Sequence, residues 1–157
     1  MCHLELYDKQ KHFDVLINLK YRQNDYDEVV ASSGMTPKEV LMATLDSQME
    51  CYVMVEKGEV FGVMGIALSD VFGAVVPWMI ATEEIMKHQL TLLKLSRKYV
   101  NEWKAKYKFL VNLVDSRNVS SIKWLEWLGF NVNKEGKWIL CDPEVPFYAF
   151  TMEELNV

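Results

Sequence analysis

The sequence predicts an α/β fold in which helices cover a central sheet. Residues 109–114 form a nearly continuous apolar run of strand length, and residues 115–118 end it with turn-forming side chains. Apolar residues then recur at helical spacing over 122–128, between a candidate N-cap at Asn118 and a candidate left-handed C-cap at Gly129. This stretch therefore predicts a buried strand, a short amphipathic helix and the start of another strand at Phe130.

The first third of the chain predicts a strand followed by helices. Polar and apolar residues alternate over 3–6, which is typical of an edge strand, and apolar residues at helical spacing follow over 13–20. Residues 21–34 are polar and irregular, and we expect a loop with a short helical turn. Thr36 and Glu39 form a capping box around Pro37 at the first helical position, which predicts a helix that runs to about Ser47.

The middle of the chain predicts three adjacent antiparallel strands and a long helix. Residues 51–56 and 60–68 read as two strands joined by a tight turn at Lys57 and Gly58, and 71–80 is apolar enough for a third strand covered on both faces. Residues 88–106 carry one apolar helical face. The opposite face carries a row of cations, which indicates a solvated surface more often than a site for an acidic partner.

The last part of the chain predicts the remaining strands, over 131–133, 138–141 and 147–151, with prolines that break or edge them. The order of elements alone leaves several topologies open. A chain of 157 residues without repeats or linkers predicts a single domain over 1–157.

Composition excludes several classes of function. A net charge of -5 and a pI near 5.2 argue against nucleic-acid and anionic-membrane binding, because phosphate groups need a basic surface. The three cysteines are far apart and show no metal-ligand spacing, so we expect no disulfide framework, no metal site and a reducing compartment. The first residues lack the pattern of a secretory signal, and the apolar runs are too short to span a bilayer.

Several motifs resemble the GNAT N-acetyltransferase superfamily. The second half of that fold is similar to the motif formed here by Asn118, Ser121, Ile122, Leu125, Gly129 and Phe130. A closer resemblance is to a GNAT-like branch of tailed bacteriophages, similar to the internal virion (core) protein A of short-tailed phages. It covers roughly residues 25–150, and its most specific part is the run from Trp124 to Phe130.

The resemblance implies a GNAT-like mixed, mainly antiparallel central sheet flanked by helices. It also implies that acyl-CoA lies between the fourth and fifth strands, with its diphosphate on main-chain N–H groups at the start of the long helix. The positions it assigns to cofactor binding are Val76, Trp78, Met79, Lys87, His88, Asn112 and Asn118. Asn118 either bonds the pantetheine arm or caps its helix, and Trp78 and Met79 either line an acceptor pocket or belong to the core.

The chain departs from the family pattern at two places. Residues 81–90 contain no glycine and include Glu83 and Glu84, so side chains and like charge oppose a close approach of the diphosphate. Against this, Lys87 and His88 supply positive charge, and the acidic pair faces away if the helix begins only at His88. The position that resembles the tyrosine acid of the family is Leu125, which has no proton to give. The remaining candidates for catalysis are His88, which as a capping or surface histidine has a simpler explanation, and Tyr148.

Two hypotheses of function follow. The first is a phage-encoded GNAT-fold protein that acts through contacts with virion or host proteins as a virion-associated or assembly factor, its acetyl-CoA site degenerate. It would reside in the host cytoplasm or be packaged in the virion. The second is an acetyl-CoA-dependent N-acetyltransferase that transfers acetyl to an amine of a protein or small molecule, for which correct positioning of the reactants supplies much of the rate. A host-directed inhibitor is a third, weaker hypothesis.

Overall fold

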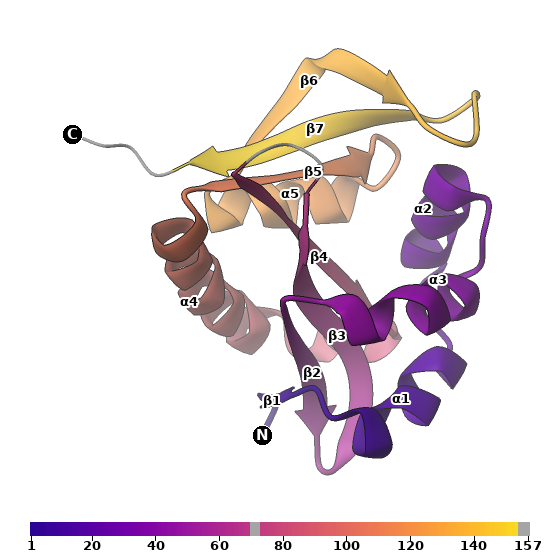
Figure 1. The fold of residues 1–157 in the computed structure, drawn as a ribbon, viewed down its shortest axis with the longest axis vertical. Coiled ribbons are helices and arrows are strands. Elements are labelled where there is room, and N and C mark those ends of the chain that lie inside the picture. Colours follow the sequence, from indigo (N-terminus) through magenta and orange to yellow (C-terminus); the bar gives the residue numbers. More distant parts are fainter. Residues whose placement is uncertain (70–72, 154–157) are drawn as a thin grey trace.

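The structure is a computed structural model that describes residues 1–69 and 73–153, and Figure 1 shows its ribbon. Its elements follow the chain in the order β1 (His3–Leu6), α1 (Lys9–Asn18), α2 (Gln23–Ser33), α3 (Pro37–Thr44), the 3-10 helix η1 (Leu45–Ser47), β2 (Glu50–Glu56), β3 (Glu59–Leu68), β4 (Ala74–Ala81), the 3-10 helix η2 (Glu83–Lys87), α4 (Gln89–Tyr107), β5 (Phe109–Asp115), α5 (Val119–Leu128), β6 (Asn131–Ile139) and β7 (Pro146–Glu153).

One sheet of seven strands runs through the molecule in the order β1-β2-β3-β4-β5-β7-β6. Every neighbouring pair is antiparallel except β4 and β5, which are parallel. The expected mixed, mainly antiparallel sheet is therefore confirmed, as are the three adjacent antiparallel strands β2, β3 and β4. Residues 71 and 72, which the sequence assigns to the third of these, lie outside the described residues.

Local sequence signals account for several boundaries. The Thr36 hydroxyl accepts the Glu39 N–H while the Glu39 carboxylate accepts the Thr36 N–H, so the predicted capping box begins α3. Lys57 and Gly58 both have positive φ, 51° and 78°, as a two-residue hairpin turn between right-twisted strands requires. Gly129 ends α5 in the left-handed region at φ 102°.

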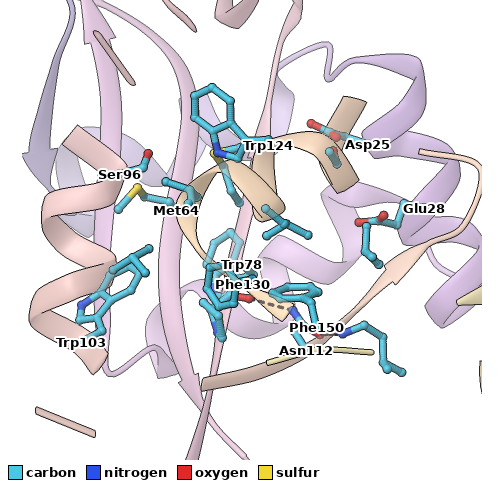
Figure 2. Close-up of a pocket in the computed structure, with 18 residues that line it drawn as sticks. Asp25, Glu28, Met64, Trp78, Ser96, Trp103, Asn112, Trp124, Phe130 and Phe150 are labelled. Carbon is cyan, nitrogen blue, oxygen red and sulfur yellow. Dashed lines mark hydrogen bonds between the residues drawn. The ribbon is translucent and has the colours of Figure 1, made fainter. Parts of the chain in front are cut away.

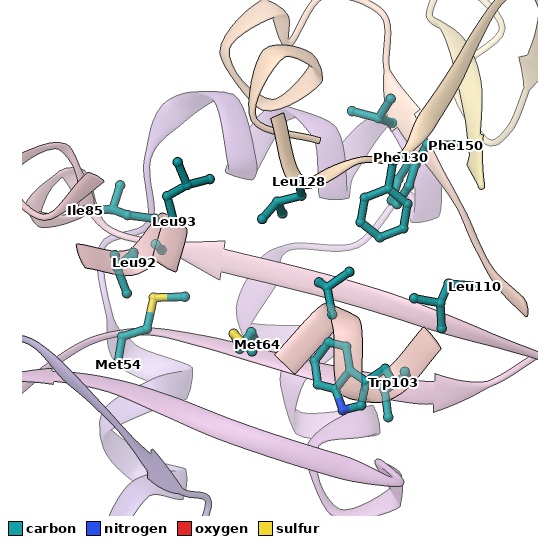
Figure 3. Close-up of a cluster of buried hydrophobic side chains, with 14 of the residues drawn as sticks. Met54, Met64, Ile85, Leu92, Leu93, Trp103, Leu110, Leu128, Phe130 and Phe150 are labelled. Carbon is teal, nitrogen blue, oxygen red and sulfur yellow. The ribbon is translucent and has the colours of Figure 1, made fainter. Parts of the chain in front are cut away.

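The two faces of the sheet bury separate hydrophobic clusters. Figure 1 shows α4 on one side of the β2–β4 strands and α1 to α3 on the other. The larger cluster packs α4 and α5 against the sheet, and Figure 3 shows Leu92, Trp103 and Leu110 in it, all almost fully buried. The smaller cluster joins α1 and α3 to the opposite face around Leu16 and Val53. The central strands are thus apolar on both faces, as the sequence predicts for the β4 region.

Three elements differ from the sequence prediction. Residues predicted as a loop form the regular helix α2, and η2 precedes α4 where no helix is predicted. The strands predicted over 131–133 and 138–141 form the single strand β6, whose register against β7 shifts between Asn133 and Trp138 and which ends at Ile139. A bulge of this kind keeps one strand in the sheet although the intervening residues leave the ladder.

Candidate functional site

The feature that organises the site is a gap between β4 and β5. Within the described residues, the two parallel strands pair only at Ala74 with Phe109 and at Val75 with Leu110, and beyond these pairs they diverge. The Asn112 side chain bridges the gap, because its Nδ2 donates to the Pro77 carbonyl over 2.8 Å. Proline suits this edge position because it has no N–H to leave unpaired there.

Met79 is the residue of β4 whose main-chain N–H and C=O face this gap. It lies between Pro77 and Ala81, whose main-chain groups form hydrogen bonds to other elements. In an antiparallel pair, every second residue turns its main-chain groups away from the partner strand. On β4 these residues include Pro77, whose carbonyl bonds Asn112, and Ala81, whose N–H donates to Asp25 Oδ2 over 3.0 Å and whose carbonyl accepts the Arg22 N–H over 2.9 Å. Met79 lies between them with the same orientation, so its N–H and C=O face the gap.

Three neighbouring cavities follow this gap through the molecule. A cavity of about 670 Å³ lies between η2, the start of α4 and α5, and we call it the α4–α5 mouth. A cavity of about 130 Å³ occupies the gap itself, as Figure 2 shows, and we call it the gap cavity. A third, of about 350 Å³, lies between α2, α3 and the sheet and is called the α2–α3 mouth. Met79 lines all three, so the three cavities adjoin one another along the gap.

Trp78 is positioned at this junction by a glycine and a glutamine. Gly65 on β3 is the cross-strand partner of Trp78 on β4. A Cβ at Gly65 would lie 3.0 Å from the indole ring and 2.8 Å from the Glu50 carbonyl oxygen. Only glycine leaves room for the ring there. The indole N–H donates to Gln48 Oε1 over 2.6 Å, which fixes the ring between the gap cavity and the α2–α3 mouth.

The start of α4 offers unpaired N–H donors at the α4–α5 mouth. His88 occupies the N-cap position of this 19-residue helix without a side-chain cap, and the first helical bond is from the Leu92 N–H to the His88 carbonyl. The preceding N–H groups, including those of Gln89 and Leu90, therefore have no partner within the helix. Because Gln89 and Leu90 line the mouth, the positive end of the helix dipole adjoins it.

The charges around the α4–α5 mouth also suit an anion. Lys123 lines the mouth and forms no ion pair within 4 Å among the described residues. The Glu126 carboxylate, which also lines it, pairs with Lys134 at 3.4 Å. A diphosphate thus fits the donors and the charge of this mouth.

The two glutamates of η2 lie apart from the α4–α5 mouth, as the sequence allows if the helix begins only at His88. The Thr82 hydroxyl caps η2, and neither Glu83 nor Glu84 is among the residues that line the mouth. Lys87 and His88 contact Glu84 at 3.3 and 3.4 Å, and Lys87 lowers the pKa of that carboxyl. Met86 and Leu90 line the mouth where the resemblance expects glycines, so a diphosphate would meet these side chains as well as the main-chain N–H groups.

Comparison with solved structures shows the same architecture in acetyltransferases. No protein-family model matches the sequence, and no curated protein matches it. A probable GNAT-family acetyltransferase from Chromobacterium violaceum has a TM-score of 0.68 at 18% identity, with 97% of this chain and 87% of that chain covered. A GNAT-family acetyltransferase from Elizabethkingia anophelis, solved with acetyl-CoA bound, has a TM-score of 0.60 at 19% identity, with 98% of each chain covered.

A spermidine N-acetyltransferase from Vibrio cholerae, in complex with CoA and spermine, has a TM-score of 0.68 at 11% identity and covers 97% of this chain and 95% of its own. This chain has the GNAT fold. The likeness concerns the fold, so the phage branch, the virion role and the location in a host remain predictions from the sequence. Within the GNAT fold, the gap between β4 and β5 is the place where the sequence resemblance expects acyl-CoA.

The structure brings together four of the residues assigned to the cofactor from the GNAT resemblance. Trp78, Met79 and Asn112 line the gap cavity, and Val76 lines the α2–α3 mouth with them. Asn118 caps α5, because its Oδ1 accepts the Ser121 N–H over 3.3 Å and the Ser120 hydroxyl over 3.2 Å. The capping role of Asn118 is therefore established, and a bond to pantetheine stays a prediction.

The other assigned residues lie outside the three cavities. Lys87 is exposed on η2, and His88 packs its ring against Phe61 with 5.3 Å between ring centroids. Tyr148 packs against the larger hydrophobic cluster. Leu125 does line the gap cavity, so the position expected to lack a proton donor faces the site. No tyrosine, cysteine or histidine is among the residues that line the three cavities in the described part of the chain.

Glu28 is the site residue that the sequence does not reveal. Its half-buried side chain comes from α2, lines both the gap cavity and the α2–α3 mouth, and accepts the Asp115 N–H over 2.9 Å. Burial raises the pKa of this carboxyl to about 7, with further contributions from the charges of Asp25 and Asp115. The Asp115 N–H opposes this increase but does not cancel it.

The described residues offer neither a metal site nor a membrane-spanning helix. Among residues 1–69 and 73–153, no group of three or more His, Cys, Asp or Glu side chains is placed to hold a metal ion. None of the helices in these residues is long and apolar enough to cross a lipid bilayer.

Proposed function

We propose that this protein is an acyl-CoA-dependent N-acyltransferase that transfers an acetyl group to an amine. The observation that carries the proposal is the gap between β4 and β5, where an anion-favouring mouth and a second mouth both adjoin the gap cavity at Met79. Two reactants can therefore enter through different mouths and meet at Met79. Such positioning alone converts acyl transfer between two molecules into a reaction within one complex.

The cofactor would be held by groups with distinct tasks. Lys123 and the first N–H groups of α4 would bind the diphosphate, and the Met79 main chain would bond the amides of the pantetheine arm. The bound thioester supplies an acyl carbon that an amine nitrogen can attack. Binding of CoA by the Elizabethkingia and Vibrio neighbours supports this assignment.

The absence of a tyrosine from the cavities bears on the mechanism. A thiolate is a better leaving group than an alkoxide or an amide anion, so it can depart without a general acid. Leu125 at the gap cavity therefore does not exclude turnover, and the proton lost by the amine nitrogen can neutralise the thiolate afterwards.

The proposal is tested by titrating the protein with acetyl-CoA in a calorimeter and by following free thiol release with a panel of primary amines. We expect a dissociation constant in the micromolar range and amine-dependent release of CoA. A protein that neither binds acetyl-CoA nor releases CoA would contradict the proposal, and the first hypothesis of a role through protein contacts would then be preferred.

A variant with a bulky side chain at Ser121 tests whether acetyl-CoA binds at the α4–α5 mouth and the gap cavity. Ser121 lines both the α4–α5 mouth and the gap cavity, so Ser121→Trp would fill the passage between them. We expect this variant to lose measurable acetyl-CoA binding. The matched control is Ser47→Trp, at an exposed serine of η1 outside the three cavities, which should bind as the unmodified protein does.

A further inference from the structure

The position of Glu28 sets it apart from the other carboxylates of the site. It projects from the inner face of α2 to the junction of two cavities, where Figure 2 shows it beside Asp25 and facing the interior that Trp78 and Asn112 also line. It is therefore reachable from the α2–α3 mouth and adjoins the gap in which the thioester would lie.

The surrounding charges leave Glu28 without a cation. On α2, Asp25 pairs with Arg22 at 2.9 Å, and at the end of β5, Asp115 pairs with Arg117 at 2.6 Å. Glu28 forms no ion pair within 4 Å among the described residues. Among the described residues, no lysine, arginine or histidine lines the gap cavity or the α2–α3 mouth, so the charged side chains that line them are all carboxylates.

The gap cavity also contains an unused polar atom. Ser96 is 4% exposed and lines this cavity, and its hydroxyl has no hydrogen-bond partner among the described residues. A buried hydroxyl without a partner costs stability unless a bound molecule satisfies it. The cavity therefore has a place for a polar reactant as well as for apolar atoms.

We propose that Glu28 is the general base of the acyl transfer and that its acceptor is a cationic primary amine entering through the α2–α3 mouth. This inference rests on the proposed acyl-CoA function. Glu28 takes one proton from the ammonium, and the resulting neutral nitrogen attacks the thioester carbonyl carbon. The C–N bond forms, the C–S bond breaks, and the second proton of the nitrogen goes to the departing thiolate.

The pKa of Glu28 suits this task. A base works best when its pKa lies near the working pH, because it is then often deprotonated and still accepts a proton readily. Burial and the two neighbouring carboxylates place the pKa of Glu28 at about 7. The approach of an ammonium ion would lower this pKa and hold the carboxylate in its charged form until the proton is transferred.

The lining of the α2–α3 mouth narrows the class of acceptor. Glu28 is the only ionisable residue that lines it in the described part of the chain, so the mouth has one anionic group for one ammonium. The rest is mainly apolar, including Leu41, Leu140 and the Trp78 ring, with Thr44 and Gln48 as neutral polar groups. This favours a monoamine on a short, mostly apolar body over a polyamine, whose second charge would have no partner.

The test compares Glu28→Gln with Asp27→Asn. Glutamine keeps the shape and an oxygen to accept the Asp115 N–H but cannot take a proton, whereas Asp27 is the adjacent carboxylate on α2 and is not among the lining residues of the three cavities. With an alkyl monoamine at neutral pH, we expect kcat/KM to fall at least about 100-fold in Glu28→Gln and less than about twofold in Asp27→Asn. Acetyl-CoA affinity should be unchanged in both.

Hydroxylamine, used as a second nucleophile, distinguishes a role of Glu28 as general base from a purely structural role. It is largely uncharged at neutral pH, so its reaction with the bound thioester needs no base to remove a proton first. After correction for the uncatalysed reaction, we expect Glu28→Gln to retain most of its activity with hydroxylamine. Equal losses with both nucleophiles, or no loss with the monoamine, would overturn the assignment of Glu28.

The outcomes also separate this inference from the proposed function. If the wild type binds acetyl-CoA and acylates a monoamine, and Glu28→Gln is equally active, only the role of Glu28 as general base is refuted. A wild-type protein that prefers a polyamine over the matched monoamine refutes the acceptor class. Failure to bind acetyl-CoA refutes the acyl-CoA function itself, and the role of Glu28 with it.

Discussion

The two mouths of the gap differ in the charge that they offer. The α4–α5 mouth has Lys123 and the free N–H groups of α4, whereas the α2–α3 mouth has the single carboxylate of Glu28. The first mouth favours an anion and the second favours a cation, although Met79 lines both. In the proposed acyl transfer, this difference would sort the two reactants by charge before they meet.

The largest effect among these variants is expected for Glu28→Gln, in its free energy of unfolding. The pKa of Glu28 rises from 4.5 to about 7 on folding, so the folded state binds this proton more tightly than the unfolded state. The ionised carboxylate therefore lowers the free energy of unfolding, and this loss grows as the pH rises through the interval. A change of one in pKa is worth about 1.4 kcal/mol, so the full penalty above neutral pH is about 3 kcal/mol. Neutral glutamine carries no such penalty.

We therefore expect Glu28→Gln to exceed the wild type in free energy of unfolding by about 2 to 3 kcal/mol at about pH 8 and by little at about pH 4.5. Urea denaturation at the two pH values measures the difference. A gain in stability together with lost monoamine transfer would show that α2 holds this carboxylate for function. A stability difference that does not change with pH would contradict a raised pKa for Glu28 in the folded protein.

The sequence reveals the frame of this site because its signals are local and apolar. The run of β5, the Asn118 cap and Gly129 specify a strand, a turn and a helix without knowledge of the rest of the fold. The apolar strand β4 carries Trp78 and Met79 to the gap. What the residues alone leave open is the divergence of β4 from β5, and the family resemblance supplies it.

Helix α2 stays hidden for a physical reason. Its inner face carries Asp25, Glu28 and Ser32, which follow helical spacing but are polar, because they face cavities and the end of β4 instead of the core. Hydrophobic periodicity cannot detect such a helix. The signals that were present are this polar spacing and Gly34, which ends the helix at φ 72°.

A smaller effect is expected at the other mouth. Lys123→Glu would replace the attraction of a diphosphate by repulsion at an exposed site, which we estimate at about 1.4 kcal/mol, or a tenfold weaker affinity for acetyl-CoA. Lys98→Glu makes the same change of charge on an exposed part of α4 outside the three cavities and serves as the control. Calorimetry at low and high salt should show the difference shrinking with ionic strength. Equal affinities for both variants would remove Lys123 from the cofactor site.

The smallest effect is expected where the acceptor meets Trp78. Gln48→Ala removes the oxygen that accepts the indole N–H, so the ring loses its fixed place between the gap cavity and the α2–α3 mouth. A lost hydrogen bond of this kind is worth about 1 kcal/mol, which corresponds to a roughly fivefold higher KM for the monoamine. Acetyl-CoA affinity should stay the same, because Gln48 does not line the α4–α5 mouth.

Gln48→Glu provides the matched rescue, since its carboxylate can again accept the Trp78 N–H. We expect the KM for the monoamine to return to the wild-type value or below it, because a second anion at this mouth also attracts the ammonium. If Gln48→Ala instead weakened acetyl-CoA binding and left the KM for the amine unchanged, Trp78 would belong to the cofactor side. The division of the gap into an anion side and a cation side would then have to be redrawn around that ring.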